Sequence, residues 1–313
     1  MRRAFLAGVL GAAALSCGDP LVRIEQATIP AGPVTAGPRV EATWMGTAGV
    51  LLDDGTTALL IDPFVSRPSL GRVAFARPIP VDEARIDLWM AMPGIERTAA
   101  VFVSHSHYDH SMDAPSFARR TDARVVGSAS TMLVGRAAGL DDSQLEPVVA
   151  GEAMRFGDFT VTMLRSRHGP AVFGREPYPG EIAPGVTMPA KAREYRTGGA
   201  YAVVVEHPAG VLVHHASAGF VPQMFDEVEA DVVLLGLAGR KDTRDYLRAV
   251  VDATGARSVV PIHYDNFFRG FDEPLAPLQS ARIDEFLDHV ADTRPDLRVR
   301  TLPLGRARPV LAP

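Results

Sequence analysis

From residue 40 onward, short apolar runs separated by turn residues predict alternating strands and helices. The first half opens with a predicted hairpin, because the turn sequence Asp53-Asp54-Gly55 separates two such runs. The expected strands are 40–44, 50–52, 58–61, 101–103, 124–127, 159–164, 201–205, 211–213, 231–235 and 258–262. The expected helices are 117–120, 131–138, 243–253 and an amphipathic 282–290. Strand pairs in both halves of the chain, each followed by helices, indicate an α/β fold.

Two proline-rich segments interrupt this pattern. Residues 65–98 form a long insertion rich in proline and arginine, and residues 169–199 carry five prolines and many glycines. Such composition is typical of loops. We expect the second segment to be an active-site loop, and we expect both segments to determine the choice of substrate.

A polar cluster directly follows the apolar run 99–103. Residues 104–110 read Ser-His-Ser-His-Tyr-Asp-His. Three imidazoles at a strand end repel one another when they are protonated. The imidazoles and the carboxylate also cost desolvation energy when they are buried without partners. A divalent metal resolves both problems, because zinc and its neighbours accept imidazole nitrogen and carboxylate oxygen as ligands. The cluster therefore indicates a metal site.

The spacing within this cluster indicates two ions. His105 and His107 lie two residues apart, so an extended chain turns both side chains to one side. Asp109 and His110 follow in a turn and can face a second point, and two ions about 3.5–4 Å apart are a known hydrolytic arrangement. The alternative is a solvent-exposed histidine-rich loop that traps metal by chance.

The motif His-x-His-x-Asp-His after a hydrophobic strand resembles the signature of the metallo-β-lactamase-fold hydrolases. The resemblance extends in order over residues 40–303, and His168 and His263 fall where the family places its remaining histidine ligands. The branch most resembled contains ascorbate-phosphate lactonases and N-acyl-phosphatidylethanolamine phospholipase D, on the strength of Ile-Asp-Pro at 61–63 and Pro-Ile-His-Tyr at 261–264. The resemblance implies a four-layer αββα sandwich as a hydrolase domain over residues 40–313.

The resemblance also implies the ligand sets. One ion would be held by His105, His107 and His168, and a second by Asp109, His110 and His263. The expected metal is Zn²⁺, with Mn²⁺ or Fe²⁺ as alternatives. Asp109 is also expected to relay a proton. Tyr264 is a candidate donor to a developing oxyanion, with ordinary packing as the alternative. Asp62, which ends an apolar run, is expected to anchor a ligand histidine or the loop backbone, with an ordinary turn aspartate before Pro63 as the alternative.

The sequence departs from the family pattern at one ligand. The family has a bridging aspartate where this chain has Ser217, in the stretch Val213-His214-His215-Ala216-Ser217. A neutral hydroxyl does not replace an anion, so two divalent ions would keep a formal charge of about +3 and repel each other more strongly. We expect the second ion to bind weakly. His215 shares the strand face of Ser217 and is a candidate replacement ligand or acid, unless both histidines only pack beside the core strand.

The N-terminal region predicts export. Residues 1–17 combine Arg2 and Arg3 with a short apolar run that ends at Cys17, the only cysteine. This is typical of a signal peptide, and Cys17 is a candidate for lipidation as in bacterial lipoproteins. The paired arginines are also consistent with twin-arginine export. Residues 18–39, with several prolines and glycines, are expected to be a tether between a membrane anchor and the domain, which would place the protein in the cell envelope.

Composition narrows the function classes further. The chain is 47% hydrophobic and 22% charged, as in ordinary globular proteins, and its net charge of −5 gives no basic footprint for nucleic acid. The function expected is a metal-dependent hydrolase acting on an ester, lactone or phosphodiester of a small-molecule or lipid-like substrate. The alternatives are an envelope protein that binds metal or ligand through a degenerate site, and oxygen chemistry at iron.

Overall fold

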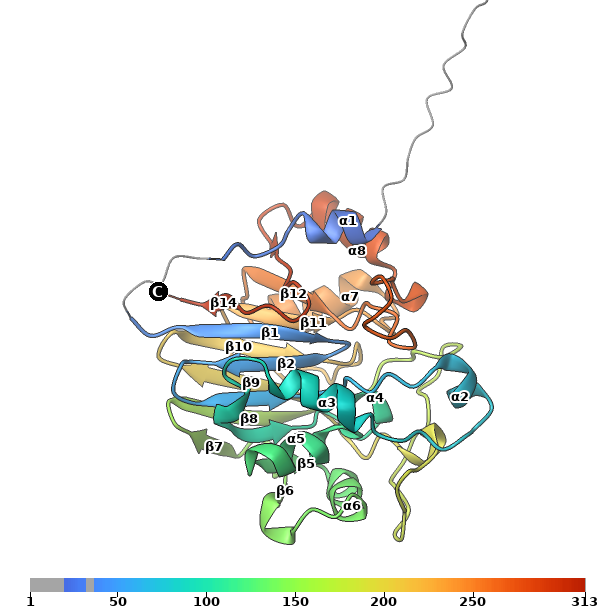
Figure 1. Ribbon diagram of the computed structural model, residues 1–313. Helices are drawn as coiled ribbons and strands as arrows, with labels where there is room; N and C mark the ends of the chain where they lie inside the picture. The colour runs from blue at the N-terminus through green and yellow to red at the C-terminus, as the bar shows by residue number, and fades with distance from the viewer. Residues whose placement is uncertain (1–19, 32–36, 313) are drawn as a thin grey trace, which may run out of the picture.

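The computed structural model describes residues 20–31 and 37–312. The predicted signal peptide and Cys17 lie outside these residues. Two seven-stranded mixed sheets form the centre of the molecule (Figure 1). The first sheet has the order β14-β1-β2-β3-β4-β5-β6 and the second has the order β13-β12-β11-β10-β9-β8-β7. The helices in the described part of the chain are too short or too polar to span a bilayer.

The strands follow the predicted alternation along the chain. The first sheet is built from β1 (Val40–Gly46), β2 (Gly49–Asp53), β3 (Ala58–Ile61), β4 (Thr98–Phe102), β5 (Arg124–Gly127), β6 (Leu145–Pro147) and β14 (Arg308–Leu311). The second is built from β7 (Ala153–Phe156), β8 (Phe159–Ser166), β9 (Ala200–His207), β10 (Gly210–His215), β11 (Val232–Gly236), β12 (Ser258–Ile262) and β13 (Arg298–Val299). All ten predicted strands are confirmed, and β6, β7, β13 and β14 are additional.

Helices cover the outer face of each sheet. The first sheet carries α3 (Glu83–Met90), α5 (Ala114–Thr121) and α6 (Ala129–Ala137). Over the second lie α1 (Pro20–Glu25), α7 (Thr243–Leu247), which continues as one π-helical turn, η4 (Arg248–Asp252), and α8 (Ile283–Thr293). Two short helices, α2 (Leu70–Ala74) and α4 (Tyr108–Ser111), stand apart from these layers. The single turns of 3-10 helix are η1 (Ile95–Arg97), η2 (Asp142–Gln144), η3 (Ala192–Glu194) and η5 (Gln279–Ala281).

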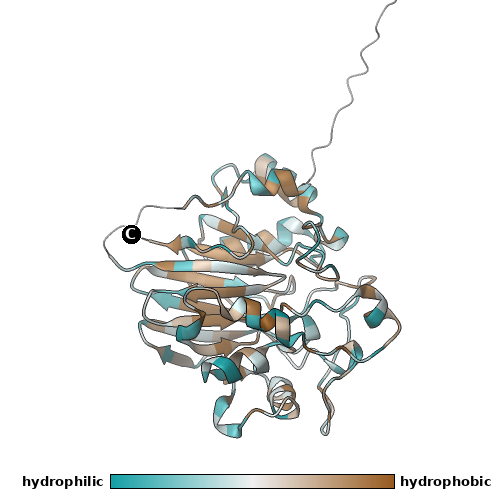
Figure 2. Cartoon of the chain, viewed as in Figure 1, coloured by the Kyte–Doolittle hydropathy of each residue, from teal (hydrophilic) through white to brown (hydrophobic). Residues whose placement is uncertain are grey.

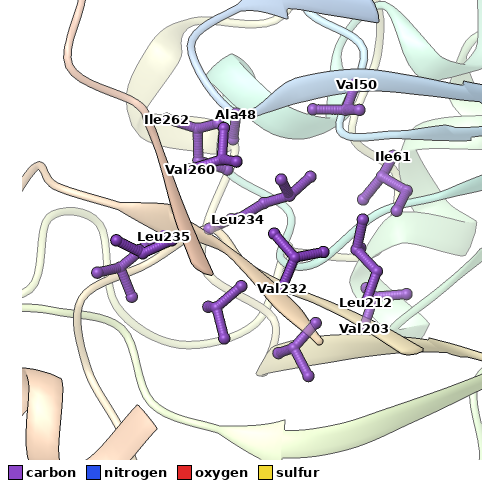
Figure 3. Close-up of a cluster of buried hydrophobic side chains, with 14 of the residues drawn as sticks. Ala48, Val50, Ile61, Val203, Leu212, Val232, Leu234, Leu235, Val260 and Ile262 are labelled. Atoms are coloured by element: carbon purple, nitrogen blue, oxygen red, sulfur yellow. The ribbon is translucent and has the colours of Figure 1, made fainter. Parts of the chain in front are cut away.

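Alternation along the strands divides the core into layers. Figure 3 shows side chains of the first sheet, such as Val50 and Ile61, facing Val203 and Leu212 of the second. The neighbouring residues point the other way, so that Leu60 packs with the helices over the first sheet. Figure 2 shows the apolar positions gathered on the strands between these helices. Since both faces of each sheet are covered, the architecture is the predicted four-layer αββα sandwich.

The prediction of a tether over residues 18–39 is wrong for residues 20–29. Leu21 and Ile24 of α1 are buried, and Arg23 forms ion pairs with Asp284 and Asp288 of α8 at 2.7 and 2.6 Å. The amide of Ile29 donates a hydrogen bond to the carbonyl of Thr301 at 2.8 Å. The proline and glycine content suggested a linker, but the two apolar side chains of this short helix find a surface on α8.

Candidate metal centre

Strand ends of both sheets bring six ligand-type side chains to one place. His105 and His107 follow β4, Asp109 and His110 lie on α4, His168 follows β8 and His263 follows β12. Their donor atoms form two groups, His105, His107 and His168 (the first ligand set) and Asp109, His110 and His263 (the second ligand set), with donor atoms within 4.8 Å of one another in each group. The imidazole rings of His105 and His110, one from each set, lie 3.9 Å apart between centroids. These two sets are the groups that the family resemblance implied.

Hydrogen bonds around Asp62 determine which nitrogens of two histidines carry protons. The hydroxyl of Ser104 donates to Asp62 Oδ2 at 2.6 Å, so it accepts a hydrogen bond from Nδ1 of His105 at 3.1 Å. Asp62 Oδ2 also accepts from Nδ1 of His110 at 2.8 Å. With both Nδ1 atoms protonated, Nε2 of each ring keeps a free lone pair. Asp62 further accepts from the amide of Ser104 at 2.7 Å, so it holds the loop backbone as well.

The other two members of the first set are oriented by different partners. Nδ1 of His168 donates to the carbonyl of Gly169 at 2.6 Å, which leaves its Nε2 free. His107 is turned the opposite way, with Nε2 3.1 Å from Oγ1 of Thr197. Because that hydroxyl gives its proton to Glu176, Nε2 of His107 is the donor and Nδ1 carries the lone pair. Thr197 and Glu176 were missed in the sequence, since no local motif marks them.

Electrostatics keeps the first ligand set neutral. Burial lowers the pKa of His107 to about 4 and that of His168 to about 3, and it lowers the pKa of His105 well below its ordinary value. Burial also opposes the charged form of His110, but Asp62 and Asp109 outweigh it and raise that pKa. Although burial alone would raise the pKa of Asp109, His110 and His263 hold it well below the usual range. Neutral imidazoles and an ionised carboxylate are the forms that bind metal.

The donor set fits a divalent metal on a further observation. Nε2 of His105 and Nδ1 of His263 are buried and have no hydrogen-bond partner among the described residues. Buried nitrogens without partners are costly in a folded protein. Five imidazoles and one carboxylate, with two orphaned nitrogens among them, are suited to zinc and to other divalent transition metals.

Two of these positions depend on unusual backbone conformations. Asp62 and His263 each directly follow a buried strand, and both adopt positive φ angles of 47° and 52°. The amide of His263 donates to the carbonyl of Thr47 at 2.6 Å, which ties the end of β12 to the turn after β1. Left-handed backbone at residues other than glycine is unfavourable and is concentrated at functional sites.

The structure separates Ser217 from His215. Ser217 lines the cavity above the ligands, and its hydroxyl accepts a hydrogen bond from the amide of Gly169 at 2.8 Å. Of the two alternatives for His215, packing beside the core strand is the one that the structure shows, because its Nδ1 lies 2.9 Å from the hydroxyl of Tyr246 and its Nε2 lies 3.3 Å from that of Ser166. Strand β10 ends at His215, so the alternation of faces no longer holds at Ser217. His214 bonds to the carbonyl of Ala48, and both histidines therefore belong to the core.

The predicted role of Tyr264 as an oxyanion donor is also wrong. Its ring stacks on Trp44 with centroids 4.8 Å apart, and it does not line the cavity. Tyr108 and Tyr178 line the cavity instead. Tyr108 lies inside the metal motif, and burial raises its pKa well above the ordinary value, which keeps the phenol protonated.

The ligands form the floor of a cavity of about 370 Å³. Its walls are mainly apolar and come from α2, from residues 171–178, and from the segment after His263, which contributes Phe267 and Phe268. No lysine or arginine is among its lining residues in the described chain. The prediction that residues 169–199 border the site thus agrees with the position of Ala171, Val172 and Tyr178.

Comparisons with known proteins give the family. The model of the Beta-lactamase superfamily domain matches residues 57–264. The chain is 28% identical over 251 residues to a UPF0173 metal-dependent hydrolase of Anaeromyxobacter dehalogenans, covering 76% of this chain and 79% of the relative. It is 25% identical over 279 residues to one of Myxococcus xanthus, covering 85% and 87%.

Solved structures share the fold. Igni18, a metallo hydrolase from the archaeon Ignicoccus hospitalis, has a TM-score of 0.53 at 17% identity and covers 86% of this chain and 97% of its own. CmlA, a diiron beta-hydroxylase from Streptomyces venezuelae, has a TM-score of 0.54 at 17% identity and covers 90% and 55%. At such identities the likeness shows the fold alone. The predicted fold and superfamily are confirmed, whereas the branch within the superfamily stays a prediction. The chain therefore belongs to the beta-lactamase superfamily, and its relatives place it among the metal-dependent hydrolases.

Proposed function

We propose that this protein hydrolyses a carboxylic ester or lactone of a small-molecule or lipid-like substrate, with Zn²⁺ as the metal. The observation that supports this most directly is the position of the two ligand sets at the floor of an apolar cavity. A bound divalent ion supplies a Lewis acid there and lowers the pKa of water toward neutrality. The ligand chemistry also permits Mn²⁺ or Fe²⁺.

The chain's own residues supply the proton acceptor. Asp109 Oδ2 lies 3.3 Å from Nε2 of His263 and 3.5 Å from Nε2 of His110. Because these imidazoles hold the pKa of Asp109 low, its carboxylate stays ionised at neutral pH. It therefore orients water at the floor of the cavity by accepting a hydrogen bond from it, and it relays a proton rather than holding one, because a carboxylate with a low pKa is a weak base. The phenol groups of Tyr108 and Tyr178 on the cavity wall can donate to a developing oxyanion.

The lining favours a carboxylic ester or lactone over a phosphodiester. Phosphate recognition in proteins commonly uses arginine or lysine, and neither is among the described residues that line this cavity. The apolar wall formed by Val172, Phe267 and Phe268 suits an acyl or alkyl group. A phosphodiester remains the alternative substrate, since metal ions themselves bind phosphate oxygens.

A second candidate function is binding without turnover, and Ser217 is the observation that favours it. Ser217 places a neutral hydroxyl at the position of the family's bridging aspartate, and this hydroxyl accepts a hydrogen bond from the amide of Gly169. An envelope protein that only binds metal or ligand would be stabilised by them without catalysing hydrolysis.

His107→Ala provides the test. With added Zn²⁺ or Mn²⁺, the full chain should hydrolyse at least one member of a panel of acyl esters, lactones and an activated phosphodiester. His107→Ala should lower kcat/KM by more than about 100-fold, since even partners outside the ligand shell are worth about 10–100-fold.

The matched control is His289→Ala, a histidine on α8 outside both ligand sets. It should retain wild-type activity. Metal-dependent thermal stabilisation without hydrolysis of any panel member would favour the binding function. Unchanged activity in His107→Ala would contradict the assignment of the site.

A further inference from the structure

Exposed apolar side chains are gathered at the mouth of the cavity. Four of the large apolar residues that the described chain leaves exposed lie on two short segments. Leu70 (58% exposed) and Phe75 (77%) lie on α2 and directly after it, and Val172 (48%) and Phe173 (100%) lie on the loop that follows His168. We call these four residues the rim. The other exposed large apolar residues, such as Leu88, are single residues elsewhere on the surface. A concentration of this kind commonly marks a binding surface.

The rim is continuous with the catalytic cavity. Val73 of α2 and Ala171 and Val172 of the loop all line it, so both segments border the same cavity. Figure 1 shows α2 at the edge of the molecule, away from the packed layers. None of the five residues of α2 is buried, although Leu70 and Val73 are apolar. Val73 is partly buried against the core cluster that contains Phe64, whereas Leu70 on this helix and Phe75 directly after it expose their apolar side chains to solvent.

The side chain of Phe173 is fully exposed and does not contribute to the packing of the core. It occupies a two-residue turn with Gly174, closed by backbone hydrogen bonds between Val172 and Arg175 at 3.1 and 2.9 Å. Both turn residues have positive φ, 48° for Phe173 and 71° for Gly174. Asparagine or aspartate is preferred at the first position of such a turn, and a bulky side chain there is unfavourable. A fully exposed phenylalanine in a strained conformation points to a role in contact with an apolar partner.

Positive charge surrounds these apolar residues. The segments 66–80 and 165–175 together contain six arginines and no aspartate or glutamate, in a chain whose net charge is −5. Arg67 pairs with the buried Asp265 and Arg165 lies over the ring of Tyr201. The remaining four are exposed: Arg72, Arg77, Arg167 and Arg175. The nearest acid after the second segment, Glu176, accepts a hydrogen bond from the hydroxyl of Thr197. The nearest acids after the first segment are Asp82 and Glu83, which line a shallow cleft together with Arg72. Exposed apolar side chains flanked by arginine are complementary to an anionic lipid surface.

We propose that the rim docks on an anionic lipid bilayer and holds the mouth of the cavity against it. Phe75 and Phe173 enter the acyl boundary, while the surrounding arginines contact the headgroups. The substrate class is then an acyl-bearing amphiphile taken up from the bilayer, a step that rests on the proposed hydrolase function. Docking itself requires no turnover, so the two proposals can fail separately.

The test places a fluorescent reporter at the tip of the loop. The full chain carries Cys17→Ser, so that no lipid can be attached there, together with Phe173→Trp. Mixed with vesicles of brominated phosphatidylglycerol, the new tryptophan should lose fluorescence by quenching, and it should lose less with brominated phosphatidylcholine. Leu88→Trp, which replaces an exposed apolar residue (75%) on α3 away from the rim, is the matched control and should not be quenched. Absence of quenching at position 173, or equal quenching at 173 and 88, overturns the proposal.

A second pair of variants tests the charge. Arg72→Gln with Arg175→Gln should weaken binding to phosphatidylglycerol vesicles roughly 30-fold, from about 1 kcal/mol for each arginine near the surface. Arg155→Gln with Arg244→Gln removes the same charge from exposed positions on β7 and α7 and should leave binding within about two-fold of wild type. Equal losses in the two double variants would show attraction by net charge alone and contradict docking through the rim.

Discussion

At the scale of single residues, proton positions decide which atoms can hold a metal. Asp62 accepts three hydrogen bonds. One comes directly from Nδ1 of His110, and another comes from the hydroxyl of Ser104, which accepts from Nδ1 of His105, so that both Nδ1 atoms keep their protons. Thr197 and Glu176 impose the opposite tautomer on His107. In His105, His107 and His110 the ligand nitrogen is therefore set by partners that do not belong to a ligand set. Losing such a partner costs affinity without removing a ligand.

Ser217→Asp should strengthen the binding of a second ion. An aspartate at this position restores an anion beside both ligand sets and reduces the repulsion between two divalent ions. We expect wild-type protein to retain one ion after mild chelation and Ser217→Asp to retain two, as measured by elemental analysis. Ser217→Asn, which is similar in size to aspartate but neutral, should behave as the wild type. Two ions that survive chelation in the wild type would show that the missing carboxylate does not weaken the site.

The sequence predicted which six ligand-type side chains the structure brings together, but not their surroundings. The ligands follow apolar strands, and that pattern is local and readable, as for His263 after Val259–Ile262. Tyr264 was assigned wrongly because its neighbour in the chain is a ligand, yet its own side chain turns to Trp44. Thr197 contacts His107 from 90 residues away in the chain. Such contacts depend on how the two sheets pack, which no short motif records.

At the scale of elements, the strands that the sequence pattern missed are the four sheet edges. Strands β14 and β6 flank the first sheet, and β13 and β7 flank the second. Strand β7 is exposed at two of its four positions and β13 has no buried residue. An edge strand is bonded on one side only, so fewer of its positions need to be apolar and its periodicity is weak. Strand β12, in the interior of its sheet, is buried throughout and was predicted with its exact bounds.

The loop that carries His263 depends on a buried ion pair. Arg67 and Asp265 pair with side chains 2% and 0% exposed, and Asp265 Oδ1 accepts from the amide of Thr47 at 2.8 Å. The carbonyl of Thr47 in turn accepts from the amide of His263. Arg67→Ala leaves a buried carboxylate without its partner, so it should lower the free energy of unfolding by about 3–5 kcal/mol. Urea denaturation measures this loss.

The control for that variant is an ion pair on the surface. Arg248 pairs with Asp245 at 3.0 Å, and both side chains are more than half exposed. Arg248→Ala should therefore change the free energy of unfolding by less than about 1 kcal/mol. If the two substitutions lower the free energy of unfolding equally, water compensates for the loss of Arg67, and the Arg67–Asp265 pair does not hold the loop that carries His263.

At the scale of the whole molecule, the ligands join the two sheets. His105, His107, Asp109 and His110 follow β4 of the first sheet, whereas His168 and His263 follow β8 and β12 of the second. Each ligand set therefore contains residues from both halves of the sandwich. A bound ion is a cross-link between sheets that otherwise meet through apolar side chains. Ligand binding to the folded state alone adds to its stability by mass action.

Metal should therefore raise the thermal stability of the entire fold. Free Zn²⁺ at about 100 times its Kd should add about 2.7 kcal/mol to the free energy of unfolding for each ion, and a chelator should remove it. Since burial holds the pKa of His168 at about 3 and that of His107 at about 4, protons do not displace metal from the first set above pH 5. The pKa of His110 is raised, so acidification should weaken the second set first. Calorimetry with and without chelator at pH 7.5 and 5.5 measures both effects, and an unfolding temperature indifferent to zinc at pH 7.5 would mean that the two halves are not bridged.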